Sequence, residues 1–265
     1  MNGMKPVALT IAGSDSGGGA GIQGDLNTFA ALGVYGASAV TALTAQNTVA
    51  VTGVHAAPAA FVALQINTVL DDLPVAAVKT GMLYGADIVE AVAGALKGRG
   101  LPLVVDPVMI AKSGDALLRE EAVAALRALL LPLALVATPN IPEAAALAGM
   151  AVATRADMEE AARKIARLGP RAVVIKGGHM EGDELTDLYY DGAVFHAFVS
   201  RRVHTPNTHG TGCAFSAAIT AGLAKGMTLF DAVAAAKEYI AGAVAAAEPL
   251  GKGHGPVAHF WRQER

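Results

Sequence analysis

Short runs of apolar residues, rich in valine, isoleucine and leucine, alternate along the chain with longer segments of helical periodicity. The apolar runs are continuous, which is typical of strands buried on both faces of a parallel sheet. They cover residues 6–12, 36–43, 75–79, 101–106, 133–138 and 171–177. Helical patterns lie between them, at 20–32, 57–71, 86–97, 119–130, 142–148 and 155–168. This order predicts a doubly wound α/β fold, with a mostly parallel central sheet and helices on both faces.

The pattern changes after residue 177. Apolar and polar residues alternate over 185–199 around Asp191-Gly192, a dipeptide typical of hairpin turns. We therefore expect an antiparallel hairpin at one edge of the sheet, near residues 185–200. Two alanine-rich helices are predicted next, at about 211–225 and 229–247, before a glycine-rich tail. No segment resembles an interdomain linker, so we expect one domain over residues 1–265.

The composition argues against several classes of function. Of the 265 residues 53% are hydrophobic and 16% charged, and the formal net charge is −3. Lysine and arginine form no cluster that would suit a nucleic acid. The longest apolar region, 125–137, contains Arg127 and Pro132 and is too short to span a bilayer. A single cysteine forms no internal disulfide, which fits a reducing compartment. We expect a cytoplasmic enzyme without nucleic-acid or membrane partners.

The glycine-rich turn after the first predicted strand is compatible with a nucleotide site. "GAGIQG", residues 19–24, matches the dinucleotide fingerprint G-x-G-x-x-G, which also needs an acidic residue about 20 positions later. No Asp or Glu occurs between Asp25 and Asp71, which argues against an NAD-dependent oxidoreductase. The P-loop pattern is absent from the sequence as well. Because Asp15 and Asp25 flank the glycines, a bound polar molecule is favoured over a purely structural turn.

Polar and special side chains follow the predicted strands, at the carboxyl ends where such sheets bind ligands. In chain order they are Gln46, Gly81, Met82, Asp106, Asn140, Glu143 and Lys176. Each alone has an ordinary structural explanation, such as a helix cap for Asn140. Five strand ends that deliver amide, carboxylate and ammonium groups to one edge nevertheless predict a ligand site.

The stretch "HGTGC", residues 209–213, is the strongest single signal. Its glycines free backbone N–H groups to point at one spot at the start of a predicted helix, where the helix dipole favours anions. Such a site suits a transferred phosphoryl group. Cys213 is either a small buried hydrophobic residue or a thiol whose pKa the helix N-terminus lowers.

Motifs along the whole chain resemble one family. They are "TIAGSDSGGGAGIQGDLNTFAALGVYG", "TALTAQNT", "KTGML", "DPVMIAKSG", "TPNIPEAAAL", "VVIKGGH", "NTHGTGC" and "GKGHGPVAHF". In this order they resemble the hydroxymethylpyrimidine/phosphomethylpyrimidine kinases of thiamine biosynthesis, which belong to the ribokinase superfamily. The resemblance implies a single ribokinase-like domain that uses ATP and Mg²⁺ and forms a homodimer. It implies phosphorylation of 4-amino-5-hydroxymethyl-2-methylpyrimidine, and then of the monophosphate to the pyrophosphate.

The resemblance also implies residue roles. Around the pyrimidine it places Gly13, Asp15, Asp25, Gln46, Gly81, Met82 and Val108. For ATP it implies Asn140, Glu143, Lys176, Thr208, His209 and Thr211, and for Mg²⁺ it implies Asp106 and Glu143. Catalysis is expected from Lys176 and from the anion hole formed by Gly210, Thr211, Gly212 and Cys213.

The catalytic base stays open at this point. Sugar and pyridoxal kinases of the superfamily carry an aspartate base where Cys213 stands, and we hypothesise that a Cys213 thiolate replaces it. The nearest alternative function is a pyridoxal (vitamin B6) kinase, which Cys213, Gln46 and Met82 disfavour. A non-catalytic pyrimidine-binding protein is a third alternative, but it would have no use for Lys176 or the anion hole.

Overall fold

The computed structural model describes residues 5–109, 120–178 and 183–263. In these ranges nine strands form one sheet, in the order β3-β2-β1-β4-β5-β6-β7-β8-β9. The strands are β1 (Val7–Asp15), β2 (Tyr35–Gln46), β3 (Val51–Ala56), β4 (Val75–Thr80), β5 (Leu103–Val105), β6 (Val136–Ala137), β7 (Ala172–Ile175), β8 (Glu184–Tyr190) and β9 (Phe195–Arg201). The six from β2 to β7 in this order are parallel, and antiparallel strands lie at both edges.

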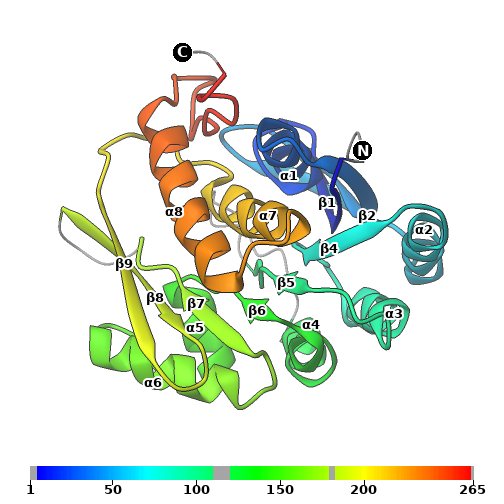
Figure 1. Ribbon diagram of the computed structural model, residues 1–265. Helices are drawn as coiled ribbons and strands as arrows, with labels where there is room; N and C mark the ends of the chain where they lie inside the picture. The colour runs from blue at the N-terminus through cyan, green and yellow to red at the C-terminus, as the bar shows by residue number, and fades with distance from the viewer. Residues whose placement is uncertain (1–4, 110–119, 179–182, 264–265) are drawn as a thin grey trace.

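Helices cover both faces of the sheet (Figure 1). They are α1 (Gly21–Ala31), α2 (Ala59–Asp72), α3 (Ala86–Leu96), α4 (Glu120–Ala125), α5 (Ile141–Ala148), α6 (Arg155–Ala166), α7 (Thr211–Ala224) and α8 (Leu229–Ala245). In β7, Val173 and Ile175 pack with α2 to α6, whereas Ala172 and Val174 pack with α7 and α8. This alternation is expected of a strand buried on both sides. The doubly wound fold is confirmed, and so is the edge hairpin near 185–200.

Two parts of the sheet differ from the prediction. Strand β2 extends beyond residue 43 to Gln46, and β3 adds an antiparallel edge that the sequence did not predict. The turn between them is closed by Asn47, whose Oδ1 accepts hydrogen bonds from the N–H groups of Val49 and Ala50 at 2.8 and 3.0 Å. Strand β3 has no continuous apolar run because it lies at an edge and is half-exposed.

The segment predicted as one helix at 119–130 is also different. Residue 119 lies outside the described residues, and α4 begins at Glu120. The helix then widens into a π turn at Leu126–Leu130 and ends in a 3₁₀ turn at Leu131–Leu133. Pro132 ends the regular pattern because proline has no N–H to donate.

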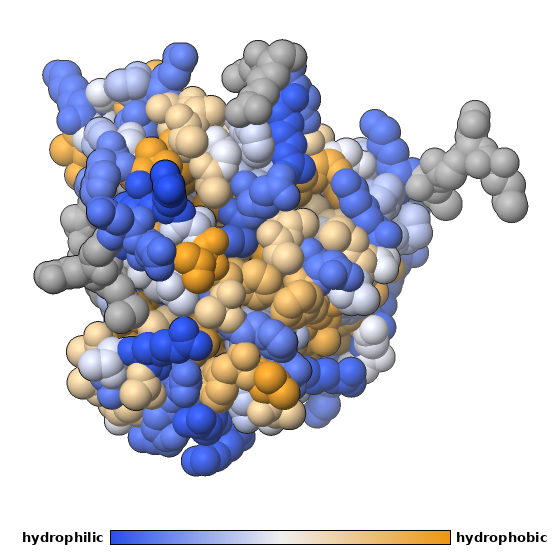
Figure 2. Space-filling model, turned by 60° about the vertical axis from the view of Figure 1, so that its left-hand side comes forward, coloured by the Kyte–Doolittle hydropathy of each residue, from blue (hydrophilic) through white to orange (hydrophobic). Residues whose placement is uncertain are grey.

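The β8–β9 hairpin is attached to α8 through aromatic contacts. Phe230 lies with its ring centroid 5.8 Å from that of Tyr189 and 5.2 Å from that of Phe198. Figure 2 brings this side forward and shows hydrophobic residues in a band between hydrophilic ones. Among the described helices, none is long and apolar enough to cross a membrane.

The C-terminal tail packs against the loop before α7 and against helices α1 and α8. The N–H of His209 donates to the carbonyl of Gly255 at 3.0 Å, which joins the tail to the loop before α7. Further on, His259 Nδ1 lies 3.1 Å from Thr28 Oγ1 on α1, and Tyr239 on α8 donates its hydroxyl to the His259 carbonyl at 2.7 Å. The tail therefore connects α1, α8 and the loop that precedes α7.

Candidate active site

A cavity of about 1060 Å³ opens at the carboxyl ends of the parallel strands. All but one of the residues expected at a site line it: Gly13, Asp15, Gln46, Gly81, Met82, Asp106, Val108, Asn140, Glu143, Lys176, Thr208, His209, Gly210, Thr211, Gly212 and Cys213. They meet there because the carboxyl ends of parallel strands share one edge of the sheet.

Asp25 is the exception, and its expected place in the ligand pocket is wrong. Its side chain is fully buried on α1 and forms an ion pair of 2.8 Å with Lys79, which is also fully buried. Thr10 donates a hydrogen bond of 2.6 Å to the same oxygen. Burial lowers the pKa of Lys79, but the carboxylate of Asp25 outweighs it and raises that pKa. Asp25 therefore balances a buried charge beneath the cavity.

A lysine between two carboxylates forms one side of the cavity. Lys176 Nζ lies 2.8 Å from Asp106 Oδ1 and 4.0 Å from Glu143 Oε2. Burial lowers the pKa of Lys176, but Asp106 and Glu143 outweigh it and raise that pKa. A Cβ atom on Gly212 would lie 3.3 Å from Lys176 Nζ, so the ammonium group adjoins the first turn of α7. Positive charge and backbone N–H groups thus meet at one place.

Glu143 and Asn140 are positioned by a capping box at the start of α5. The Asn140 side chain accepts from the Glu143 N–H at 2.9 Å, and Glu143 Oε2 accepts from the Asn140 N–H at 2.8 Å. Burial raises the pKa of Glu143 to about 7, although Lys176 acts in the opposite direction. The helix-cap explanation for Asn140 thus holds, and the same residues also line the cavity.

The described residues contain no group of three or more His, Cys, Asp or Glu side chains that could hold a metal ion alone. Asp106 and Glu143 supply two carboxylates on either side of Lys176. Mg²⁺ is commonly bound through one or two carboxylates while substrate phosphates and water complete its coordination. This pair fits such a shared site.

The loop before α7 has the geometry of an anion site. Gly210 is the N-cap residue, with φ of 79°, and a side chain there would overlap the carbonyl oxygen of Gly19. Glycine is therefore required both for the left-handed backbone and for the close approach of the two loops. Residues 210–213 at the start of α7 line the same cavity as Lys176, where the helix dipole favours an anion.

Cys213 lies in the first turn of α7 and lines the cavity. The expectation that its pKa is lowered is wrong, because burial raises the pKa of the thiol to about 11. Lys79 acts in the opposite direction, whereas Asp25 and Asp106 raise the pKa further. The residue stays partly accessible from the cavity, but its surroundings disfavour a thiolate near neutral pH.

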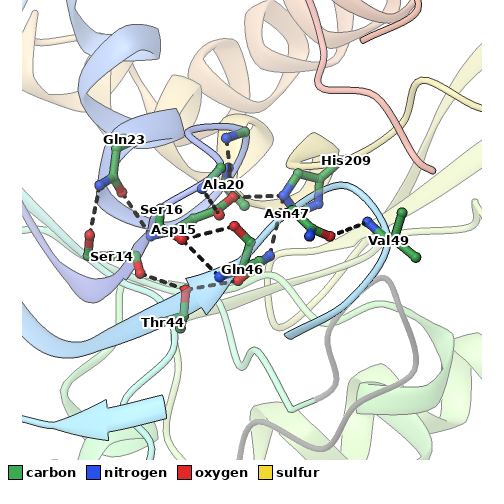
Figure 3. Close-up of polar contacts among 12 residues, drawn as sticks. Ser14, Asp15, Ser16, Ala20, Gln23, Thr44, Gln46, Asn47, Val49 and His209 are labelled. Carbon is green, nitrogen blue, oxygen red and sulfur yellow. Dashed lines mark hydrogen bonds and ion pairs between the residues drawn. The ribbon is translucent and has the colours of Figure 1, made fainter. Parts of the chain in front are cut away.

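At the other end of the cavity, Asp15 organises the first glycine loop (Figure 3). Its carboxylate accepts from the N–H groups of Gly17, Gly19 and Ala20 at 2.8, 3.2 and 2.9 Å, and lies 2.8 Å from His209 Nε2. Burial raises the pKa of Asp15, but the hydrogen bond to His209 and those to the loop outweigh it and lower that pKa. Asp15 thus joins the loop after β1 to the loop before α7.

Gly13, Met82 and Gln46 form an apolar pocket with an amide at its edge. The Met82 carbonyl accepts from the Gly13 N–H at 3.1 Å and from the Thr41 hydroxyl at 2.7 Å, which fixes the loop after β4. A side chain on Gly13 would overlap the terminal methyl group of Met82, so glycine leaves room for this side chain. A thioether beside a polar amide suits a flat heteroaromatic ring.

One wall of the cavity was not predicted from the sequence. It is lined by residues of β8, of the end of β9 and the segment after it, and of α8, namely Leu185, Asp187, Arg201, Arg202, Val203, His204, Thr205, Pro206, Lys237, Ile240, Ala241 and Val244. Within it, Lys237 Nζ lies 2.8 Å from Asp187 Oδ2. The rule that ligands bind at the carboxyl ends of parallel strands does not predict this wall, because the wall is formed by the antiparallel edge of the sheet and a helix face. The alternation within β8 was the one available signal.

Comparisons with known proteins show the family of the chain. A family model for phosphomethylpyrimidine kinase matches residues 15–258. The hydroxymethylpyrimidine/phosphomethylpyrimidine kinase of Rhizobium meliloti is 55% identical over 262 residues, and the match covers 98% of each chain.

Solved structures of two kinds are similar to the chain. Pyridoxal kinase from Bacillus subtilis, in an ADP complex, superposes with a TM-score of 0.91 and 42% identity, covering 99% of this chain and 100% of that one. Phosphomethylpyrimidine kinase from Clostridium difficile superposes with a TM-score of 0.80 and 43% identity, covering 89% and 98%.

Proposed function

Because this chain belongs to the phosphomethylpyrimidine kinase family, we propose that it phosphorylates 4-amino-5-hydroxymethyl-2-methylpyrimidine with ATP. We propose that it then phosphorylates the resulting monophosphate to the pyrophosphate. The observation that carries the proposal is the single cavity with two different ends. Gly13, Gln46 and Met82 line the same cavity as Lys176 and the N-terminus of α7.

The reaction needs alignment and charge neutralisation more than covalent help from the protein. Lys176 and the N-terminus of α7 would hold the transferred phosphoryl group, since Lys176 and residues 210–213 line the same cavity. Asp106 and Glu143 would hold Mg²⁺ together with the phosphates. When bound, this ion neutralises charge on the phosphate oxygens. The wall around Val203, Ile240 and Val244 would enclose the nucleoside of ATP.

The state of Cys213 fits an enzyme with two acceptors. A neutral thiol does not repel the dianionic monophosphate, whereas an aspartate at this position would. The second acceptor is already ionised near neutral pH and needs no base. For the first acceptor, a protonated Cys213 thiol cannot act as the base, so the hydroxyl proton would pass to an oxygen of the transferred phosphoryl group as the transfer proceeds.

A second candidate function is pyridoxal phosphorylation. It is favoured by the close superposition on pyridoxal kinase from Bacillus subtilis, which covers nearly the whole chain. Phosphorylation of the pyrimidine is preferred over that of pyridoxal, because the matching family model and the relative from Rhizobium meliloti are both named phosphomethylpyrimidine kinases.

The test is ADP release measured separately with the hydroxymethylpyrimidine, its monophosphate and pyridoxal. The two pyrimidines should be turned over with much higher kcat/KM than pyridoxal. Lys176→Ala should lower turnover by about 10²-fold, as loss of an electrostatic stabiliser does. A higher kcat/KM for pyridoxal would overturn the assignment.

We also propose that the enzyme works with Mg²⁺ as a cytoplasmic homodimer, as the family resemblance implies. Removal of Mg²⁺ with a chelator should abolish ADP release, and light scattering should give twice the mass of the 26.8 kDa chain. A monomer that retains full activity would contradict the second part.

A further inference from the structure

The Gln46 amide makes two contacts in which donors and acceptors are wrongly paired (Figure 3). The first is at Thr44, whose Oγ1 lies 2.9 Å from the Ser14 carbonyl oxygen and 3.1 Å from Gln46 Oε1. A hydroxyl has one hydrogen, and both of these neighbours are acceptors. The shorter contact, to the Ser14 carbonyl, takes that hydrogen. The amide oxygen of Gln46, 3.1 Å away, would therefore face a lone pair of the Thr44 hydroxyl.

The second contact is at His209. Its Nε2 lies 2.8 Å from Asp15 Oδ2 and 3.5 Å from Gln46 Nε2. The Asp15 carboxylate also accepts from three backbone N–H groups, so it is ionised and has no hydrogen to donate. His209 Nε2 must therefore carry the hydrogen of that contact. An amide nitrogen facing it places one donor against another.

A half-turn of the amide removes both mismatches. The oxygen and nitrogen of a glutamine side chain occupy equivalent positions, and the hydrogen-bond network decides between them. After the turn, the amide nitrogen donates to Thr44 Oγ1 and the amide oxygen faces the N–H of His209. The backbone of Gln46 stays fixed by Ser16 Oγ, which contacts the Gln46 N–H at 2.8 Å and its carbonyl at 2.9 Å.

We propose that Thr44 and His209 are positioning residues that hold the Gln46 amide in this turned orientation and thereby set the substrate edge that the enzyme accepts. In this orientation one N–H and one oxygen lone pair of Gln46 remain for the ligand. With the 4-aminopyrimidine as the substrate, this oxygen would accept from the amino group and this N–H would donate to the adjacent ring nitrogen. The inference rests on the proposed function, because it concerns recognition of the pyrimidine ring.

The consequence is discrimination between two rings of nearly equal shape. A 4-aminopyrimidine presents donor then acceptor, whereas the corresponding 4-oxopyrimidine presents acceptor then donor. A freely turning amide would accept either edge. When Thr44 and His209 hold the Gln46 amide, it can accept the 4-oxo edge only by turning back. Turning back restores the mismatched contacts with both residues.

The test compares Thr44→Val with Thr44→Ser on the 4-amino and 4-oxo forms of 5-hydroxymethyl-2-methylpyrimidine. Valine keeps the shape of Thr44 but removes the hydroxyl, whereas serine keeps the hydroxyl. The preference in kcat/KM for the amino form should fall about tenfold in Thr44→Val, as loss of one oriented hydrogen bond does, and stay near wild type in Thr44→Ser. The change should lie in KM for the pyrimidine, with KM for ATP unchanged.

A direct measurement keeps the proposal testable if Thr44→Val does not fold. In ¹⁵N-labelled wild type, the side-chain NH₂ of Gln46, assigned by comparison with Gln46→Leu, should show an NOE to the Thr44 methyl group. NOEs to the His209 ring instead would overturn the proposal. An unchanged preference in folded Thr44→Val, or equal losses in both variants, would do the same.

Failure of the proposed function gives a different result. Wild type would then phosphorylate neither pyrimidine, while the NOE pattern of Gln46 would still report the amide orientation.

Discussion

Asp25 and Lys79 form an ion pair from which water is excluded, below the floor of the cavity. We predict that Asp25→Leu lowers the free energy of unfolding by about 3–5 kcal/mol, because it leaves the ammonium of Lys79 buried and unpaired. Chemical denaturation measures the change. The double variant Asp25→Leu/Lys79→Met should recover much of the loss, because it removes both charges together.

The matched control is Asp71, which pairs with Arg99 at 3.3 Å on the surface. Asp71→Leu should change the free energy of unfolding by less than about 1 kcal/mol. If Asp25→Leu costs no more than this control, Asp25 does not balance a buried charge.

The second prediction at this scale concerns the Cys213 thiol. Its alkylation by iodoacetamide should be slow at pH 7 and still rising at pH 9.5, because the pKa is about 11 and the thiolate is the reactive form. A short unstructured peptide with one internal cysteine, measured in parallel, should level off above its ordinary pKa of about 8.5. A protein rate that levels off below pH 8 would restore the hypothesis of a preformed thiolate.

At the scale of elements, the start and the end of α7 offer a matched pair of glycines. Gly210 and Gly226 have φ of 79° and 83°, but only at Gly210 would a side chain meet the loop that contains Gly19. We predict that Gly226→Ala costs about 1 kcal/mol of stability, the cost of a left-handed alanine, and leaves turnover unchanged. Gly210→Ala should also lower kcat by about 10²-fold, because it displaces the anion site.

The comparison of Gly210→Ala with Gly226→Ala separates the effect of a strained backbone from the effect of disturbing the contact with the Gly19 loop. Equal kinetics in the two variants would show that the approach of the Gly19 loop to α7 does not matter for the reaction. Denaturation of both variants verifies that the kinetic difference is not a folding difference.

The residues that sequence analysis placed correctly follow parallel strands. Gln46, Asp106 and Lys176 line one cavity because parallel strands end at one edge, which follows from the chain order alone. The wall that includes Lys237 was not predicted, because an antiparallel edge and a helix face bring it in, and their positions depend on packing. Strand β3 was missed because an exposed edge strand needs no apolar run.

Asp25 was misplaced although the sequence carried a signal for its position. It lies three residues after Ile22 and four before Phe29, which are both buried on α1. This spacing places Asp25 on the apolar face of the helix. Lys79, at the end of the apolar strand run 75–79, indicated that a buried carboxylate was needed nearby.

At the scale of the whole molecule, the pH dependence of stability should reflect His259. Thr28 donates its hydroxyl to the Gly24 carbonyl at 2.8 Å, so His259 Nδ1 donates to Thr28 Oγ1. His259 Nε2 is then unprotonated and buried, with no hydrogen-bond partner among the described residues. Burial lowers the pKa of His259 from 6.5 to about 4. Below pH 6.5 the unfolded chain takes up a proton that the folded chain does not accept.

The free energy of unfolding should therefore fall as the pH decreases from 6.5 to 4, by about 3 kcal/mol from this group, and should be unaffected by it above pH 6.5. His259→Asn, which can still donate to Thr28, should show a smaller decrease over this range. The exposed His55 is the control, since His55→Asn should leave the pH dependence as in wild type. A decrease that is equal in all three proteins would contradict the assignment to His259.

The contacts of the C-terminal tail also order events during synthesis. The carbonyl of Gly255 accepts from the His209 N–H, and His209 holds Asp15 near the beginning of the chain. A chain synthesised only as far as residue 250 already contains all the strands described here, the last of which ends at Arg201, but it has no Gly255 to support His209. The sheet can therefore fold before the loop that carries His209 is fixed, and substrate recognition through Asp15 and His209 is completed only after Gly255 has been added.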